Sequence, residues 1–69
     1  PTPTPPDFAF YRKRANEYAD KKDFDRAISD YNEAIRLNPQ DAVSFYSRGI
    51  AYHYQNNGTR AFEDYKTAV

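Results

Sequence analysis

The stretch that decides the fold is FDRAISDYNEAIRLNP, residues 24–39. Its apolar side chains recur three or four positions apart, which is the spacing of residues along one face of an α-helix. Polar and charged side chains fill the positions between them. Pro39 stops the helix, because proline lacks a backbone N–H and pushes the preceding residue toward an extended conformation. The stretch therefore predicts one amphipathic helix with a defined end.

Three other segments of the chain show the same spacing. The four stripes are Phe8, Tyr11, Ala15 and Tyr18; Phe24, Ala27, Ile28, Tyr31, Ala34 and Ile35; Phe45, Gly49 and Tyr52, extended by Gln55; and Ala61, Phe62, Tyr65, Ala68 and Val69. Asp7, Asp23 and Asp41 stand before the first three stripes, where an aspartate side chain caps the first turn of a helix. No segment shows the alternation of a β-strand, so the sequence predicts four helices.

The helices repeat along the chain. A shift of 34 residues aligns the first half with the second. The identical pairs are Arg14 and Arg48, Tyr18 and Tyr52, Arg26 and Arg60, Ala27 and Ala61, Asp30 and Asp64, Tyr31 and Tyr65, and Ala34 and Ala68. The near matches are Tyr11 and Phe45, Ala15 and Gly49, Ile28 and Phe62, and Ile35 and Val69. Most of these are the small and large members of the stripes, which is what close packing of two helices requires.

Two helices per 34 residues, small residues beside aromatic ones, and Pro39 at the end of the unit resemble the tetratricopeptide repeat. The resemblance implies an all-α fold of two stacked antiparallel helix-turn-helix hairpins, a fragment of a right-handed α-solenoid. It divides the chain into a Pro/Thr-rich linker at 1–7, a first repeat at 8–41 and a second, truncated repeat at 42–69. We expect the chain to be part of a longer array.

Two departures from the family pattern have structural consequences. Arg14 and Arg48 stand where the family often has leucine, and we expect their aliphatic stems to pack while the charged ends reach solvent. Lys22 and Asn56 occupy the turn position at which the family usually has glycine. Asparagine tolerates a positive φ far better than lysine does.

Composition argues against several classes of function. Ten basic and ten acidic side chains balance to zero, so the chain has no overall attraction for nucleic acid or an anionic membrane. There is no cysteine, and His53 is the only histidine, so we expect no metal and no other cofactor. Neighbouring carboxylates such as Glu63 and Asp64 do not face one another on a helix, and a glycine-rich phosphate loop is missing. We therefore expect no catalysis.

The first six residues, Pro1–Pro6, alternate proline with threonine before a final pair of prolines. Each proline fixes its own φ, so the segment reads as an extended polyproline stretch. The favoured interpretation is a linker. The alternative is a ligand for an aromatic-lined groove.

Binding to a protein is the favoured function. By resemblance to the family, the first helix of each repeat lines a concave surface that holds a peptide or partner segment. The residues at these positions are Arg12, Asn16 and Asp20 in the first repeat and Val43, Tyr46, Ile50, His53 and Tyr54 in the second. Helical spacing supports this set independently, because each group forms a stripe beside the core stripe of its helix. The third helix is thus apolar on two faces, and one partner helix cannot cover both.

Two other ligands fit the sequence less well. A subclass of the family binds the terminal carboxylate of a peptide with a clamp of basic and asparagine side chains. Arg12 and Asn16 match its first two positions, whereas Ser47 replaces the next asparagine, so the match is partial. An RNA partner is disfavoured, because basic residues alternate with acidic ones and form no basic stripe.

Self-assembly is the alternative function. The last stripe carries Phe62, Tyr65, Ala68 and Val69, and the sequence provides no following helix to cover them. Units of a solenoid contact only their neighbours, and a terminal unit needs a polar or capped outer face. A second copy of the chain would bury this stripe, which would make the protein a scaffold fragment that forms homo-oligomers.

Overall fold

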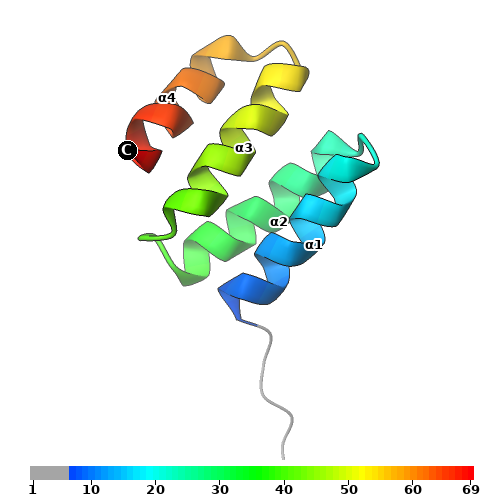
Figure 1. Ribbon diagram of the computed structural model, residues 1–69, viewed down its shortest axis with the longest axis vertical. Helices are drawn as coiled ribbons and strands as arrows, with labels where there is room; N and C mark the ends of the chain where they lie inside the picture. The colour runs from blue at the N-terminus through cyan, green and yellow to red at the C-terminus, as the bar shows by residue number, and fades with distance from the viewer. Residues whose placement is uncertain (1–6) are drawn as a thin grey trace, which may run out of the picture.

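The computed structural model describes residues 7–69. It contains four α-helices: α1 (Phe8–Asp20), α2 (Phe24–Leu37), α3 (Ala42–Tyr54) and α4 (Gly58–Ala68) (Figure 1). No strand occurs between residues 7 and 69. The prediction of an all-α fold is confirmed. The polyproline prediction for Pro1–Pro6 lies outside the described residues.

The helices form two antiparallel hairpins that stack side by side (Figure 1). α1 packs against α2, and α3 packs against α4. α3 also packs against α2 and so joins the two hairpins. α1 touches α3 at few positions, and α4 contacts no helix other than α3 in the described part of the chain. The outer side of α4 therefore lacks a neighbouring helix among the described residues.

Polar side chains start three of the four helices. The Asp7 carboxylate accepts a hydrogen bond from the backbone N–H of Phe10 at 3.1 Å, and the Asp23 carboxylate accepts one from Arg26 at 3.3 Å. These two caps were predicted, and they satisfy donors that the first turn leaves without partners. The structure adds a cap on α4 from the side chain of Asn57.

Asp41 differs from the prediction. It precedes α3, yet its carboxylate makes no capping bond to the first turn. The carboxylate instead accepts hydrogen bonds from the hydroxyl of Ser44 at 2.6 Å and from Arg12 at 3.1 Å. Arg12 lies on the other hairpin, so the prediction of a simple helix cap is wrong for a reason that helical spacing does not contain: a charged group of α1 competes for the same oxygens.

The two hairpin turns share one backbone conformation. Lys22 has φ 66° and Asn56 has φ 62°, so both lie in the left-handed region. In the first turn the backbone N–H of Asp23 donates to the carbonyl of Tyr18, and in the second that of Asn57 donates to Tyr52, both at 2.9 Å. These bonds close the end of each helix with a left-handed residue, as glycine usually does. The prediction that these positions demand a glycine-like conformation is confirmed.

Small residues bring the two helices of each hairpin together. In the first hairpin Ala15, Ala27 and Tyr31 form a fully buried cluster. In the second, a Cβ added at Gly49 would lie 2.7 Å from a ring carbon of Tyr65 and 3.2 Å from the carbonyl oxygen of Ala61. The glycine is therefore needed for the close approach. The paired small residues act as the internal repeat predicts.

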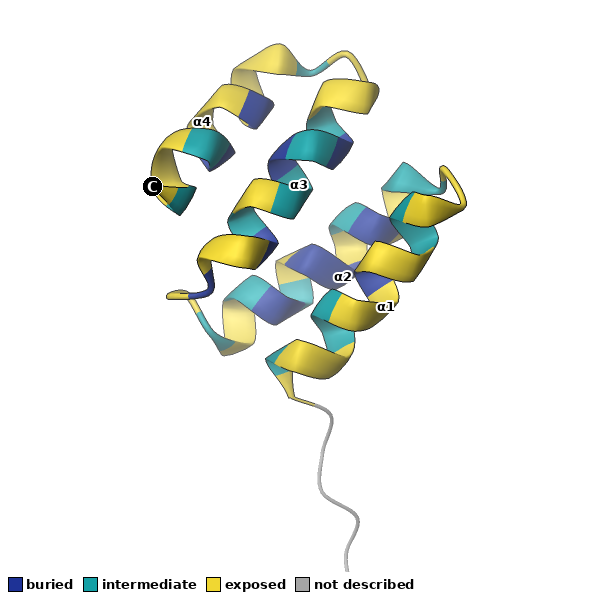
Figure 2. Cartoon of the chain, viewed as in Figure 1, coloured by how far each residue is buried: buried dark blue, intermediate teal, exposed yellow. Residues whose placement is uncertain are grey.

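A second buried interface was not recognised in the sequence. Ser44 and Ala51 are 0% and 1% exposed, because they form the side of α3 that packs on α2. The buried residues lie where helices face one another, and exposed residues occupy much of the remaining surface of α1, α3 and α4 (Figure 2). Phe62 belongs to this exposed surface although it follows the core spacing: it is 60% exposed, while its counterpart Ile28 is partly buried.

We predict that Lys22→Gly stabilises the fold. A left-handed φ strains a residue that carries a Cβ, and glycine removes this strain. The free energy of unfolding should rise by about 0.5–1 kcal/mol, measured by urea denaturation followed by circular dichroism. Lys21 has φ −88°, so Lys21→Gly is the matched control and should lower stability. A Lys22→Gly protein less stable than the parent would contradict the argument.

We predict that Gly49→Ala destabilises the fold, against the usual effect of this change in a helix. Alanine gains about 1 kcal/mol of helix propensity, but the added methyl group must displace the Tyr65 ring, and overpacking costs about 1–3 kcal/mol. A net loss of about 1 kcal/mol is expected in the same denaturation experiment. No atom lies within 4 Å of a Cβ added at Gly58, so Gly58→Ala should not destabilise. Equal effects of the two changes would refute the steric explanation.

Candidate functional site

The predicted binding residues lie on α1 and α3, the first helix of each hairpin. We call this set the α1–α3 face; it comprises Arg12, Asn16, Asp20, Val43, Tyr46, Ile50, His53 and Tyr54. The α1 residues are mostly engaged with neighbouring side chains. The α3 residues are mostly exposed. The two halves therefore have different chemistry.

Arg12 does not offer a free charge. Its guanidinium donates to both carboxylate oxygens of Asp41, at 3.1 and 3.2 Å. The guanidinium also lies 5.6 Å from the centre of the Phe8 ring. Asp41 is buried, so the pair is partly shielded from water and links α1 to the start of α3. Any anion that binds Arg12 must compete with this carboxylate.

Asn16 belongs to a small polar network at the junction of the hairpins. Its side-chain oxygen accepts a hydrogen bond from the hydroxyl of Tyr31. Burial raises the pKa of Tyr31; Ser47 opposes this shift through a hydrogen bond, and the charge of Asp20 adds to it. Asn16 and Asp20 are themselves exposed. The amide group of Asn16 thus retains its N–H donors for a ligand, while its oxygen holds Tyr31.

The α3 half of the face is apolar and open. Val43, Tyr46 and Tyr54 are 52%, 54% and 58% exposed. His53 is also exposed, and Ile50 is partly buried. Tyrosine provides a large contact area with a polar tip, which suits a surface that exchanges water for a protein ligand. These side chains are the surplus apolar face that the sequence assigns to the third helix.

The structure divides the α3 residues between two neighbourhoods. Tyr54 stacks on Phe24 of α2, with ring centres 5.2 Å apart and planes 6° apart. The ammonium group of Lys22 lies 5.6 Å from the Tyr54 ring, and the His53 ring is 5.7 Å away. The centre of the Tyr46 ring instead lies 5.5 Å from the centre of the Tyr65 ring on α4. On this face, Tyr54 therefore contacts the first hairpin, whereas Tyr46 contacts α4.

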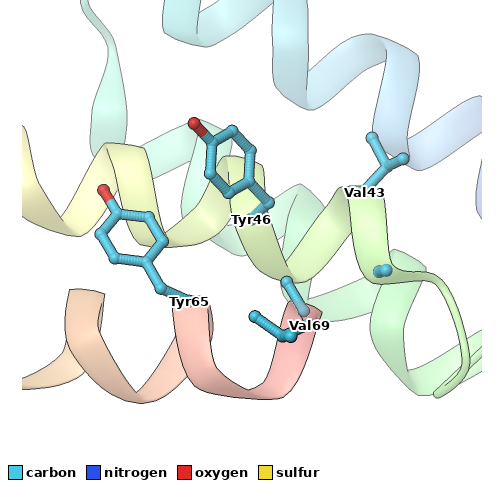
Figure 3. Close-up of a pocket in the computed structure, with 6 residues that line it drawn as sticks. Val43, Tyr46, Tyr65 and Val69 are labelled. Atoms are coloured by element: carbon cyan, nitrogen blue, oxygen red, sulfur yellow. The ribbon is translucent and has the colours of Figure 1, made fainter.

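Tyr46 and Tyr65 line a pocket of about 410 Å³ between α3 and α4 (Figure 3). Its wall consists of Ala42, Val43, Tyr46, Tyr65, Ala68 and Val69. The two rings lie side by side, with Val43 and Val69 toward the opposite end of the pocket (Figure 3). The pocket joins two groups that the sequence analysis kept separate: residues assigned to peptide binding and residues assigned to self-association.

Each hairpin contains a two-bond arginine–aspartate pair that the sequence analysis missed. Arg14 donates to Asp30 at 2.6 and 2.8 Å, and Arg48 donates to Asp64 with two bonds of 2.8 Å. The prediction that these arginines reach solvent with their charged ends fits Arg14, whose side chain is 44% exposed, but not Arg48, whose side chain is 19% exposed. In both cases a buried carboxylate holds the guanidinium. These hydrogen bonds raise the pKa of both arginines. The sequence contains a signal for these pairs, because Arg14 and Asp30 are 16 residues apart and so are Arg48 and Asp64.

No group of three or more histidine, cysteine, aspartate or glutamate side chains is close enough together between residues 7 and 69 to hold a metal ion. Within the same residues, no helix has the length and apolar character required to cross a membrane.

The stacked hairpins define an α-helical repeat protein. A family model described as TPR repeat matches residues 15–56, which is more than half of the chain. The chain belongs to the tetratricopeptide repeat family. The resemblance inferred from the sequence is confirmed, and the repeat is a protein-interaction repeat rather than a catalytic unit.

Curated relatives contain the same repeat within much longer proteins. Human serine/threonine-protein phosphatase 5 is 42% identical over 41 residues, covering 59% of this chain and 8% of the phosphatase. The Hsp70-Hsp90 organising protein of Plasmodium falciparum is 32% identical over 53 residues, covering 77% of this chain and 9% of that protein. Stress-induced-phosphoprotein 1 of Caenorhabditis elegans is 29% identical over 58 residues, covering 84% and 18%. The chain spans less than a fifth of each relative, so the similarity extends to the repeat alone.

We predict that stability falls at alkaline pH through Tyr31. Burial raises the pKa of its hydroxyl above the ordinary value of 10.0, so the folded state favours the neutral form. A raised folded-state pKa gives stability that is complete below the unfolded pKa and is lost as pH rises through the folded pKa. Urea denaturation from pH 7 to pH 11 should show this decline. The decline in the free energy of unfolding should be shallower in Tyr31→Phe than in the parent. In Tyr46→Phe, which removes an exposed hydroxyl, the decline should match that of the parent.

Proposed function

We propose that the chain is a protein-interaction module that holds a peptide or partner segment on the α1–α3 face. The observation that carries this proposal is the exposure of Val43, Tyr46 and Tyr54, each more than half accessible on one helix. Large apolar side chains gathered on a surface favour contact with another molecule. The family assignment supports the same class of function.

The chemistry of the face favours a ligand with apolar side chains. Tyr46 and Tyr54 offer ring faces and edges, and rigid aromatic side chains dominate the energetics of many protein interfaces. Polar groups flank them: His53 on α3, and the amide N–H donors of Asn16 on α1. Such donors fix the orientation of a peptide backbone. The ligand would thus bind through apolar contacts, with polar groups setting its direction.

A terminal carboxylate is a poorer ligand for this face. Arg12 has the position of the first basic residue of a carboxylate clamp, but Asp41 already neutralises it with two contacts near 3.1 Å. Ser47 stands where the clamp has a further asparagine. Two of the required donors are therefore occupied or replaced. We propose that recognition depends on the interior of the bound segment more than on its end.

The experiment is a binding screen on immobilised peptides, followed by titration of the strongest ligand. Tyr46→Ala and His53→Ala should each weaken binding about fivefold or more, which corresponds to about 1 kcal/mol. Phe62→Ala and Lys13→Ala are the controls, because they remove an exposed aromatic ring and an exposed charge outside the α1–α3 face. Unchanged affinity in both test variants would exclude the face.

The role of the terminal carboxylate is tested with the same peptide. Amidation of its C-terminus removes the charge, and we expect less than a twofold loss of affinity. Asp41→Asn frees Arg12 from its ion pair and should strengthen binding of the free carboxylate form only. A large loss on amidation of the peptide would favour the clamp instead.

A further inference from the structure

We infer that Asn57 is a modification site, at which the chain deamidates spontaneously and so alters its own α3–α4 turn. Asn57 precedes α4, and Gly58 is the first residue of that helix. The turn connects the two helices of the second hairpin (Figure 1). The reaction requires water but no enzyme or cofactor. It is independent of peptide binding on the α1–α3 face.

Asparagine is a labile residue, because the backbone nitrogen of the next residue can attack its side chain. At this turn the Gly58 nitrogen loses its proton and attacks Cγ of Asn57, so that a new C–N bond closes a five-membered succinimide ring. The bond from Cγ to the side-chain nitrogen breaks, and this nitrogen leaves as ammonia. Water then opens the ring at one of its two carbonyls. Attack at Cγ gives aspartate, and attack at the main-chain carbonyl gives isoaspartate, whose main chain runs through Cγ.

The sequence favours Asn57 among the five asparagines of the chain. A side chain on the following residue hinders the attack, and glycine carries none. Proline cannot take part, because it has no N–H. The other asparagines precede larger residues: glutamate follows Asn16 and Asn32, proline follows Asn38, and asparagine follows Asn56. Asn57 alone is followed by glycine.

The backbone nitrogen of Gly58 is available for the attack. The first N–H groups of an α-helix have no carbonyl one turn earlier to bind, and no hydrogen bond from the Gly58 N–H occurs between residues 7 and 69. By contrast, Glu17 and Glu33 lie inside α1 and α2, where each N–H donates to the carbonyl four residues earlier. Attack on Asn57 therefore breaks no hydrogen bond of the attacking nitrogen.

The turn also leaves room for the ring and for water. Asn56 and Gly58 are exposed, and no atom lies within 4 Å of a Cβ added at Gly58. Within the described part of the chain, the Asn57 side chain makes one hydrogen bond, in which its oxygen accepts from the N–H of Arg60 at 3.3 Å. This bond is longer than the usual distance of about 2.9–3.0 Å. Since helix ends fray, the bond does not hold Asn57 permanently out of reach.

The two products have opposite effects on the turn. Aspartate caps a helix as well as asparagine does, and its negative charge is favourable at a helix N-terminus. Isoaspartate adds a carbon atom to the main chain between the N–H of residue 57 and the start of α4. That N–H donates to Tyr52 at 2.9 Å, and the side chain caps Arg60, so the two bonds cannot both keep their geometry. One product therefore preserves the second hairpin, and the other loosens it.

The test is incubation of the full chain at mildly alkaline pH, folded and unfolded in urea. Trypsin cleavage after Arg48 and Arg60 releases residues 49–60, and mass spectrometry of this peptide locates the modified residue. Conversion should occur at Asn57 before any other asparagine, including Asn56 in the same peptide. The rate in the folded chain should lie within about tenfold of the rate in urea, because the turn does not shield the site.

Gly58→Ala is the matched variant, because its methyl group hinders the attack but meets no atom of the fold. It should slow conversion at Asn57 about tenfold or more. Conversion at the parental rate in Gly58→Ala would overturn the proposal, as would a folded parent that keeps Asn57 intact while the sample in urea reacts.

The effect on the turn is measured by thermal unfolding followed by circular dichroism. Asn57→Asp should melt no lower than the parent, because it reproduces the product that keeps the cap. The isoaspartate form, separated by chromatography from the incubated sample and refolded, should melt lower than both. An isoaspartate form that melts with the parent would disprove the loosening of the second hairpin.

Discussion

The close crossing of the two helices in each hairpin is the constraint on which the rest of the structure depends. Ala15 meets Ala27 beneath Tyr31, and Gly49 meets Ala61 beneath Tyr65. Only small residues allow backbones to approach so closely, and the tyrosine then fills the space beside the contact. With this crossing fixed, the turns need a left-handed residue, and the first helix of each hairpin is free to present its other side.

The arginine–aspartate pairs are the polar counterpart of this crossing. Each pair spans the two helices of one hairpin, and each aspartate is buried. A buried carboxylate is tolerated only when hydrogen bonds replace its lost hydration, and two bonds from one guanidinium do so. Arg48 also donates to Asn32 and so connects the second hairpin to the first. Leucine at these positions would leave each buried carboxylate without the two hydrogen bonds that the arginine donates.

The sequence was sufficient for the fold because its signals are local. Helical spacing, the aspartate caps before α1 and α2, and the glycine-like turn positions at Lys22 and Asn56 each depend on a few neighbouring residues. The internal repeat then fixed how the helices combine. The resemblance to the family supplied the residues of the candidate site.

The errors have one physical origin, which is contact between helices far apart in sequence. Asp41 binds Arg12 across the two hairpins and so does not cap α3. Tyr46 and Tyr54 both belong to the α1–α3 face, yet one lies beside α4 and the other stacks on α2. Helical periodicity says which side chains share a face but not which neighbour each will meet. The neighbours of each residue on the α1–α3 face could therefore be identified only from the structure.

The position of α3 has a consequence for how the molecule opens. Contacts between helices run in series, from α1 and α2 through α3 to α4. Separation of α4 leaves the first hairpin intact, whereas displacement of α3 removes support from both of its neighbours. We therefore expect local opening to be easiest at α4, so that the amide protons of this helix exchange with solvent before those of α2.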